Sequence, residues 1–239
     1  MNQLAIDTAT EACSVALACA GTVYARWIEA PREHGERIFA MLDAVLAEAG
    51  IDRRAIDVLV LGRGPGAFTG VRMATGVVQG IALGLDRPVI RVSTLAALAQ
   101  GAWSRHGETA WLPAIDARMG EVYWGMYRIE EGVAVAAEAE CVAAPDAVPV
   151  PEAGQWAGVG TGWAVYGEAL AARVGPRLGC NHGHALPAAA DMLPAAQRAW
   201  ERGEAVEAAA ALPTYLRDQV AAPSAARAAY RPNTAGRTP

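Results

Sequence analysis

The sequence predicts an α/β protein made of two related halves that face each other across a cleft. Apolar runs typical of strands alternate with helical stretches along most of the 239 residues. Each half also opens in the same way, with an apolar strand, an aspartate at its end, a tight turn and a returning strand. These openings are residues 4–7 with 13–19, and residues 113–116 with 121–127. The repeat places one aspartate at each lip of the predicted cleft.

The first half is expected to begin with three strands and to continue as alternating helices and strands. Apolar and alternating runs predict strands at residues 4–6, 13–19, 22–29, 57–62 and 88–92. Apolar side chains three and four residues apart predict helices at residues 33–49 and 69–85, and a third helix that ends near Trp103. Gly50 is the expected end of the first helix, and Ser93 or Thr94 is the expected cap of the third.

The second half starts near residue 110 and becomes less regular. A strand at residues 156–162 is expected to enter a glycine turn and a helix that ends near residue 174, and further helices are expected at 188–203 and 204–211. Residues 142–151, rich in proline and alanine, are expected to form a loop. We therefore expect a first lobe at residues 1–105, a second at 106–222 and a flexible tail at 223–239. As an alternative, a C-terminal helix packs back on the first lobe.

Composition excludes several classes of protein. Hydrophobic residues make up 53% of the chain and charged residues 19%, which excludes a disordered protein. A net charge of −5 argues against a surface that grips nucleic-acid phosphates. All 20 basic residues are arginines, so Schiff-base chemistry and a P-loop lysine are excluded.

The cellular compartment is also suggested by the residue pattern. Charges and glycines interrupt the apolar stretches, so no membrane span is expected. Acidic rather than basic residues precede the first apolar stretch, which is unlike a secretory leader. The four cysteines form no CxxC pair and are expected to be reduced thiols. We therefore expect a cytoplasmic protein.

Several features are candidates for chemistry, and each has a plainer interpretation. Asp7 and Asp116 fit a magnesium-bound phosphate or a general base, but equally fit aspartates that hydrogen-bond their own turns. The glycine turns at residues 64–70 and 158–162 suit an anion or a nucleotide, yet ordinary turns are favoured at both. Three potential metal ligands lack a second pair of ligands, so no metal site is expected: Cys180, His182 and His184.

The predicted helix at residues 69–85 carries three glycines at four-residue spacing, Gly76, Gly80 and Gly84. Each glycine costs about 1 kcal/mol relative to alanine in a helix, so three in one row call for compensation. Close approach of another helix is the usual compensation. The sequence leaves open whether that helix belongs to this chain or to a partner. The same side of the helix carries Arg72, Met73 and Leu83.

Six segments together resemble the TsaB (YeaZ) family. They are residues 4–10 (LAIDTAT), 34–37 (HGER), 64–72 (GPGAFTGVR), 92–95 (VSTL), 116–123 (DARMGEVY) and 213–217 (PTYLR). The third and fifth segments in combination are specific, whereas either alone would not be. The resemblance implies a two-lobed fold of the actin, sugar-kinase and Hsp70 type with duplicated mixed-sheet domains.

The resemblance also implies a function in tRNA modification. Members of this family are expected to act without catalytic residues of their own, as scaffold and activator of TsaD. TsaD transfers the threonylcarbamoyl group to N6 of adenosine 37 in tRNAs that read ANN codons. The implied partners are TsaD in a heterodimer, the ATPase TsaE in a ternary complex, tRNA through the complex, and a second copy when the chain is alone. No cofactor is expected in this chain, since ATP and a metal ion would belong to the partner subunits.

Site residues follow from the resemblance in two groups. The implied partner interface comprises Arg72, Met73, Gly76, Gly80, Leu83, Gly84, His34, Arg37 and Met41. A vestigial nucleotide cleft would comprise Asp7, Thr8, Asp116, Gly160 and Thr161. TsaD carries a His-x-x-x-His metal pair at positions that are Thr94 and Leu98 here, and neither suits a metal. The competing hypotheses are an ATP-dependent phosphotransferase that uses the cleft and, ranked last because no HExxH is present, a metallopeptidase-like protein.

Overall fold

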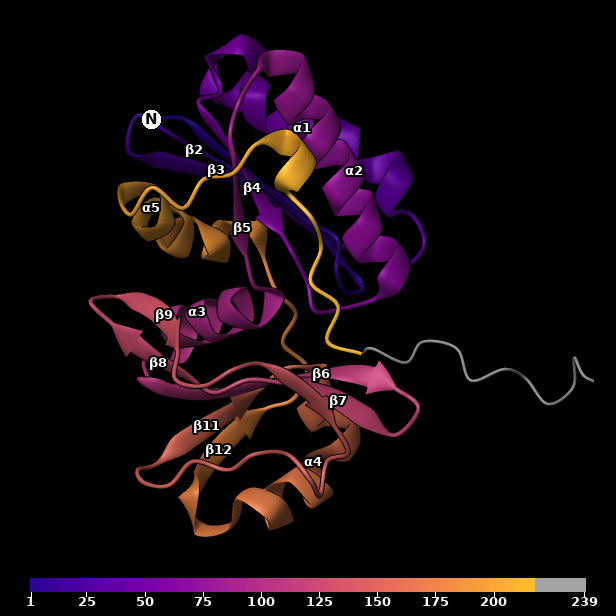
Figure 1. The fold of residues 1–239 in the computed structure, drawn as a ribbon, viewed down its shortest axis with the longest axis vertical. Helices are drawn as coiled ribbons and strands as arrows, with labels where there is room; N and C mark the ends of the chain where they lie inside the picture. The colour runs from indigo at the N-terminus through magenta and orange to yellow at the C-terminus, as the bar shows by residue number, and fades with distance from the viewer. Residues whose placement is uncertain (218–239) are drawn as a thin grey trace, which may run out of the picture.

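The computed structural model describes residues 1–217, which form two stacked lobes (Figure 1). The predicted tail at residues 223–239 lies outside the described residues. The first lobe contains a five-stranded sheet in the order β3-β2-β1-β4-β5. Its strands are β1 (Gln3–Asp7), β2 (Ala12–Cys19), β3 (Thr22–Glu29), β4 (Val58–Gly62) and β5 (Val89–Val92).

The second lobe contains a seven-stranded sheet whose main path runs β10-β7-β6-β11-β12. Its strands are β6 (Ala110–Arg118), β7 (Glu121–Trp124), β8 (Tyr127–Glu130), β9 (Val133–Ala136), β10 (Cys141–Ala143), β11 (Trp156–Val159) and β12 (Leu178–His182). In each sheet, an antiparallel hairpin (β1–β2 or β6–β7) adjoins two parallel strands. This shared strand order confirms the predicted duplication.

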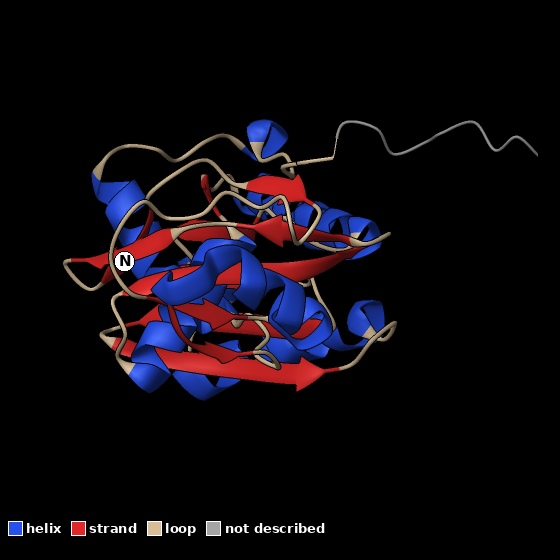
Figure 2. Cartoon of the chain, turned by 90° about the horizontal axis from the view of Figure 1, so that it is seen from below, coloured by secondary structure: helices blue, strands red, loops and turns tan. Residues whose placement is uncertain are grey.

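Helices and sheets alternate as layers along the long axis of the molecule (Figure 1). Figure 2 views the molecule along this axis, so that the helices and strands of the two lobes overlap. The helices are α1 (His34–Ala49), α2 (Phe68–Leu85), α3 (Thr94–His106), α4 (Thr161–Val174) and α5 (Leu193–Glu201). α1 and α2 cover one face of the first sheet, α3 lies between the two sheets, and α4 covers the far face of the second sheet. Three apolar cores fill the spaces between these layers, and the middle core joins both lobes through α3.

The predicted helix ends are confirmed at two positions. Gly50 ends α1 in a left-handed conformation with φ of 67°, which glycine adopts without a steric cost. Ser93, rather than Thr94, caps α3, because its hydroxyl accepts hydrogen bonds from the amides of Leu95 and Ala96.

Other predicted elements were wrong, and each error reflects a tertiary contact. The returning strand expected at 121–127 stops at Trp124, since the chain then turns to pair β8 with β9. Residues 142 and 143, expected in a loop, belong to β10 because the edge of β7 is free to pair with them. The helix expected at 204–211 shrinks to the short 3-10 helix Ala208–Ala210, because Val206 pairs with Val89 at the edge of β5. The edge strand β12 was not predicted.

By length and composition alone, α2 is long and apolar enough to cross a membrane. One third of its residues are buried inside the protein. These buried side chains, including Val71, Ala74 and Val78, pack on the first sheet within the core shared with α1. Its apolar character is thus partly explained as that of a core helix, and the opposite side of α2 needs a separate explanation.

A buried carboxylate ties the two lobes together. The Glu140 side chain of the second lobe is only 7% exposed. It accepts hydrogen bonds from the Ser93 hydroxyl and from Arg63 (3.0 Å), both in the first lobe, and from the Tyr127 hydroxyl (2.5 Å). Burial and the neighbouring carboxylate raise the pKa of Tyr127, so its hydroxyl stays protonated and donates. We call these four residues the inter-lobe clasp.

Candidate functional site

The side of α2 that faces away from the sheet forms an open surface together with α1. Gly76, Gly80 and Gly84 lie exposed along it. A groove of about 420 Å³ follows the glycine row, and it is lined by Phe39, Arg53, Gly76, Val77, Gly80, Ile81, Gly84 and Leu85. We call this surface the α1–α2 face.

No contact within residues 1–217 accounts for the three glycines. Among residues 1–217, no heavy atom outside the helix's own backbone lies within 4 Å of the position a Cβ would take at Gly76, Gly80 or Gly84. The possibility that another helix of this chain packs on the row is therefore wrong for the described residues. Each glycine therefore lowers the stability of the helix by about 1 kcal/mol relative to alanine, and no contact inside the described lobe offsets this loss.

Large apolar side chains are exposed around the glycine row. Phe39, which lines the groove, is 52% exposed, and Leu83, three residues after Gly80, is 78% exposed. Isolated exposed hydrophobic residues are ordinary, but a groove with a glycine row and exposed apolar side chains marks an interaction surface. The α1–α2 face therefore has the shape and composition of a helix-docking site.

The remaining predicted interface residues lie in different surroundings. Arg37 is exposed and pairs with Glu33 at 2.7 Å, one turn earlier in the chain. Met41 and Met73 are half-buried, and Met73 fills the space between the helices beside Gly35. His34 is buried, and its ring hydrogen-bonds the Thr10 carbonyl oxygen at 3.0 Å, so it supports the loop under α1 rather than adding to the exposed surface.

Arg72 connects α2 to the end of the described chain. Its guanidinium group lies 3.6 Å from the centre of the Phe68 ring and donates a hydrogen bond to the Tyr215 hydroxyl at 2.9 Å. The Phe68 and Tyr215 rings also contact each other, with centres 5.8 Å apart. Sequence reasoning missed this contact because nothing local relates residues 143 positions apart.

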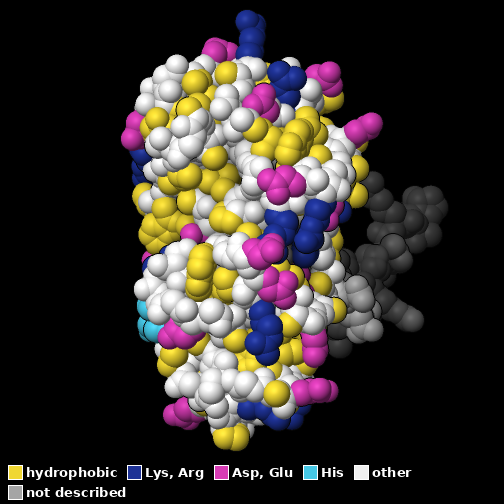
Figure 3. Space-filling model, turned by 90° about the vertical axis from the view of Figure 1, so that its left-hand side faces the viewer, with side chains coloured by type: hydrophobic (Ala, Val, Ile, Leu, Met, Phe, Trp, Pro, Cys, Tyr) yellow, Lys and Arg dark blue, Asp and Glu magenta, His cyan; other side chains and the backbone are white. Residues whose placement is uncertain are grey.

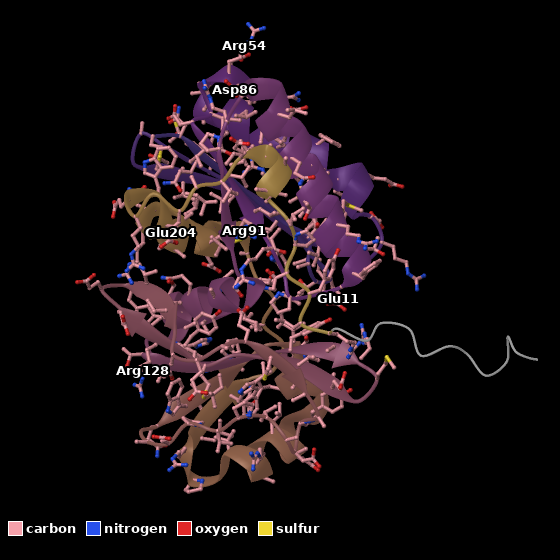
Figure 4. The ribbon with its side chains drawn as sticks, in the orientation of Figure 1. Glu11, Arg54, Asp86, Arg91, Arg128 and Glu204 are labelled. Carbon is pink, nitrogen blue, oxygen red and sulfur yellow. The ribbon has the colours of Figure 1, made fainter. Side chains whose placement is uncertain are left out.

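A cavity of about 340 Å³ lies between the lobes, where the sequence predicts a cleft. Its walls are formed by the β1–β2 turn, the start of α2 and the β6–β7 turn. The segment 214–217 also lines the cavity. Arg217 holds that segment in place through the Glu121 carboxylate and the Ala117 carbonyl oxygen. Arg118 spans the opening, with Glu11 at 3.1 Å on the first lobe (Figure 4) and Asp116 at 2.8 Å on the second.

The two predicted carboxylates do not meet in this cavity. Asp7 is fully buried, where it accepts hydrogen bonds from the Ala9 amide (2.7 Å) and the Thr94 hydroxyl (3.2 Å). Asp116 lines the cavity, but it accepts hydrogen bonds from the backbone and the side chain of Arg118, both at 2.8 Å. Both residues therefore stabilise their own turns, which is the plainer of the two interpretations.

The other three cleft residues are also engaged internally. The Thr8 hydroxyl donates to the Gly70 carbonyl oxygen at 2.7 Å, and the Thr161 hydroxyl accepts from the Asp116 amide at 3.1 Å. A Cβ at Gly160 would lie 2.5 Å from the Ala114 carbonyl oxygen, so the backbone there packs on β6. Of the five predicted cleft residues, the structure brings Asp116 alone to the cavity wall.

The burial of Asp7 makes a pH-dependent prediction. Burial raises the pKa of Asp7 from its ordinary 3.8 to about 6, although the Ala9 amide and Thr94 hydroxyl partly offset the effect. The folded state therefore binds this proton more tightly than the unfolded state. Binding of this proton stabilises the folded state, and this contribution is fully present below pH 3.8. It is lost as the pH rises through 6, which lowers the free energy of unfolding by about 3 kcal/mol.

Asp7→Asn is accordingly expected to raise the free energy of unfolding by up to about 3 kcal/mol at pH 7.5, with little change at pH 4. Urea denaturation at both pH values measures this difference. Asp146→Asn, at an exposed position, is the control and should change stability equally little at both. An equal effect of Asp7→Asn at the two pH values would contradict the prediction.

The cluster of potential metal ligands differs from the one that the sequence suggests. Cys180 and His182 do lie together, with the sulfur 3.8 Å from Nε2, but His184 is not part of the group. The third member is Glu108, whose Oε1 lies 3.7 Å from the same sulfur. Sequence reasoning missed Glu108 because it precedes Cys180 by 72 positions.

Comparison with known proteins gives consistent results. The model of the TsaD family, described as tRNA N6-adenosine threonylcarbamoyltransferase, matches residues 28–225. The tRNA threonylcarbamoyladenosine biosynthesis protein TsaB of Escherichia coli (strain K12) is 47% identical over 92% of this chain and 96% of its own length. The protein of the same name from Haemophilus influenzae is 38% identical over 92% of this chain and 95% of its own length.

A solved structure agrees with these sequence relatives. YeaZ from Pseudomonas aeruginosa superposes with a TM-score of 0.85 at 49% identity, over 90% of this chain and 99% of that one. Together with the duplicated sheets, this likeness confirms the predicted two-lobed α/β fold with a mixed sheet in each lobe. The chain belongs to the TsaB (YeaZ) family of tRNA threonylcarbamoyladenosine biosynthesis proteins.

Proposed function

We propose that this chain is a non-catalytic subunit that binds and activates TsaD for transfer of the threonylcarbamoyl group to N6 of adenosine 37. The observation that carries the proposal is the α1–α2 face, with an uncovered row of three glycines beside exposed apolar side chains. Glycines let two helix backbones approach closely, so the stability lost inside this chain is recovered when a partner helix packs on the row.

The positions that correspond to the metal-binding pair of TsaD support a non-catalytic role. Thr94 is completely buried, and its hydroxyl donates a hydrogen bond to the Asp7 carboxylate. Leu98 is 1% exposed and belongs to the middle apolar core. Neither side chain offers a ligand to a metal at this place, so the metal ion of the transfer reaction would be held by TsaD.

The complex would be assembled around α1 and α2. These helices would pack on their equivalents in TsaD, TsaE would join with its ATP, and tRNA would bind to the complex in the cytoplasm. In the absence of TsaD, a second copy of this chain would occupy the same face. Neither a phosphotransferase nor a peptidase finds support in the geometry, since Asp7 is withdrawn from the cavity and Asp116 is bound to Arg118.

The test is the combined variant Arg72→Glu with Gly80→Leu. The introduced leucine side chain occupies the space in which the partner backbone would lie, and the glutamate breaks the contacts of Arg72 with Phe68 and Tyr215 beside it. We expect co-purification with TsaD and threonylcarbamoyl transfer to tRNA to be abolished, while circular dichroism of the chain is unchanged. Gly80→Leu alone should weaken assembly at least tenfold, since a lost interface of this kind costs more than about 1.4 kcal/mol.

Gly167→Leu provides a matched control, because this glycine lies on α4 in the second lobe and also has no heavy atom within 4 Å of its Cβ position. It should leave both assembly and transfer unchanged. Normal co-purification of the combined variant would overturn the interface. Threonylcarbamoyl transfer by TsaD and TsaE in the complete absence of this chain would overturn the activating role.

A further inference from the structure

Glu108, Cys180 and His182 form a compact group of three different metal-binding side chains on the second lobe. We propose that they bind one zinc ion, with water in the fourth position. The site lies far from the α1–α2 face and serves neither the docking nor the cavity described above. Figure 3 shows histidine side chains exposed on the lower half of one face of the molecule.

The fold explains how the three side chains come together. Cys180 and His182 are two positions apart in β12, and residues two apart in a strand point to the same side of the sheet. Glu108 belongs to the connection between α3 and β6, where the chain passes from the first lobe to the second. β11 lies between β6 and β12, and its Ala157 pairs with Trp111 on one side and with Cys180 on the other, so the residues just before β6 lie at the same level of the sheet as Cys180.

The two distances from the Cys180 sulfur suit zinc. In tetrahedral coordination with Zn–S of about 2.3 Å and Zn–N or Zn–O of about 2.0–2.1 Å, ligand atoms lie about 3.6 Å apart. Here the Cys180 sulfur lies 3.7 Å from the Glu108 Oε1 and 3.8 Å from the His182 Nε2. All three ligand atoms lie within 4.8 Å of one another.

The second oxygen of the Glu108 carboxylate also favours a cation at this place. The Oε2 atom of Glu108 is buried and, within the described part of the chain, has no hydrogen-bond partner. A buried carboxylate oxygen without a partner is costly, and a cation bound by this carboxylate would offset part of that cost. The C-terminus of α3, two residues before Glu108, adds partial negative charge at the same place.

A stacking contact fixes the orientation of one of the three side chains. The His182 ring stacks on the His106 ring with centres 3.7 Å apart. Arg105, near the end of α3, has its guanidinium group 3.8 Å from the Asp191 carboxylate.

A zinc ion at this position would join the connection between the lobes to an edge strand. β12 is the last strand of its sheet, and β11 is its pairing partner. The metal would hold β12 to the residues that follow α3, and so stabilise the second lobe when zinc is present.

The experiment uses the full-length chain and zinc alone. The metal-free protein is titrated with zinc in competition with a chromogenic chelator, and with cobalt to record the thiolate charge-transfer band in the ultraviolet. We expect one zinc per chain and a cobalt spectrum with one thiolate ligand. Cys180→Ser and His182→Ala should each weaken zinc binding by about a hundredfold, and Cys180→Ser should abolish the charge-transfer band.

Two variants of the same residue types serve as controls. His184→Ala removes a histidine two positions from the site, and Cys19→Ser removes a thiol on β2. Both should bind zinc as the unaltered chain does. The proposal is overturned if the unaltered chain binds no zinc, or if Cys180→Ser and His182→Ala bind it as tightly as the controls. Circular dichroism of each variant, whose altered side chains lie at or near the surface, verifies that it is folded.

Discussion

Gly70→Ala is expected to lower the free energy of unfolding by about 3 kcal/mol or more. Gly70 lies in the first turn of α2, and a Cβ there would lie 2.0 Å from the Thr8 carbonyl oxygen. That atom belongs to the backbone at the end of β1, which cannot move without disturbing the sheet. The Thr8 hydroxyl also donates to the Gly70 carbonyl oxygen, so the two backbones are held together from both sides.

Gly80→Ala, in the same helix, is expected to have the opposite effect. Its Cβ would meet no other atom of the described chain, so the higher helix propensity of alanine should raise stability by about 1 kcal/mol. Urea denaturation of both variants, at dilutions where the chain is monomeric, measures the two changes. Equal stability of Gly70→Ala and Gly80→Ala would show that the contact between Gly70 and Thr8 is not tight.

Glu140→Ala is expected to lower the free energy of unfolding by about 3–5 kcal/mol. The substitution leaves Arg63, Ser93 and Tyr127 without their common acceptor at the junction of the lobes. A cation and two hydroxyls would then be buried or half-buried without a partner. Because these groups come from both lobes, we also expect the lobes to move more freely relative to one another.

Thermal and urea denaturation measure the loss of stability, and hydrogen exchange of α3 measures the freedom of the lobes. Glu140→Gln, which keeps an acceptor oxygen, should lose less than Glu140→Ala. Glu48→Ala removes a surface carboxylate that is 50% exposed and pairs with Arg26, and it should cost at most about 1 kcal/mol. A similarly small loss for Glu140→Ala would mean that the clasp does not hold the lobes.

Local patterns were sufficient to predict most of the architecture. Apolar periodicity gave α1 and α2 nearly to the residue, and the repeated strand, aspartate and turn correctly indicated two related lobes. The errors fall where pairing partners decide the conformation, as at β10 and at Val206. A short segment has little intrinsic preference, so the free edge of a neighbouring strand determines its structure.

What the sequence by itself determined is therefore the succession of elements, the duplicated fold and the glycine row on α2, because these depend on residues a few positions apart. The tertiary structure alone decided that Asp7 is buried, that Gly70 is confined whereas Gly80 is free, and that Glu108 joins Cys180 and His182. Each of these properties depends on which distant segment packs against the residue. Desolvation, steric contact and ligand geometry exist only once the chain has brought those segments together.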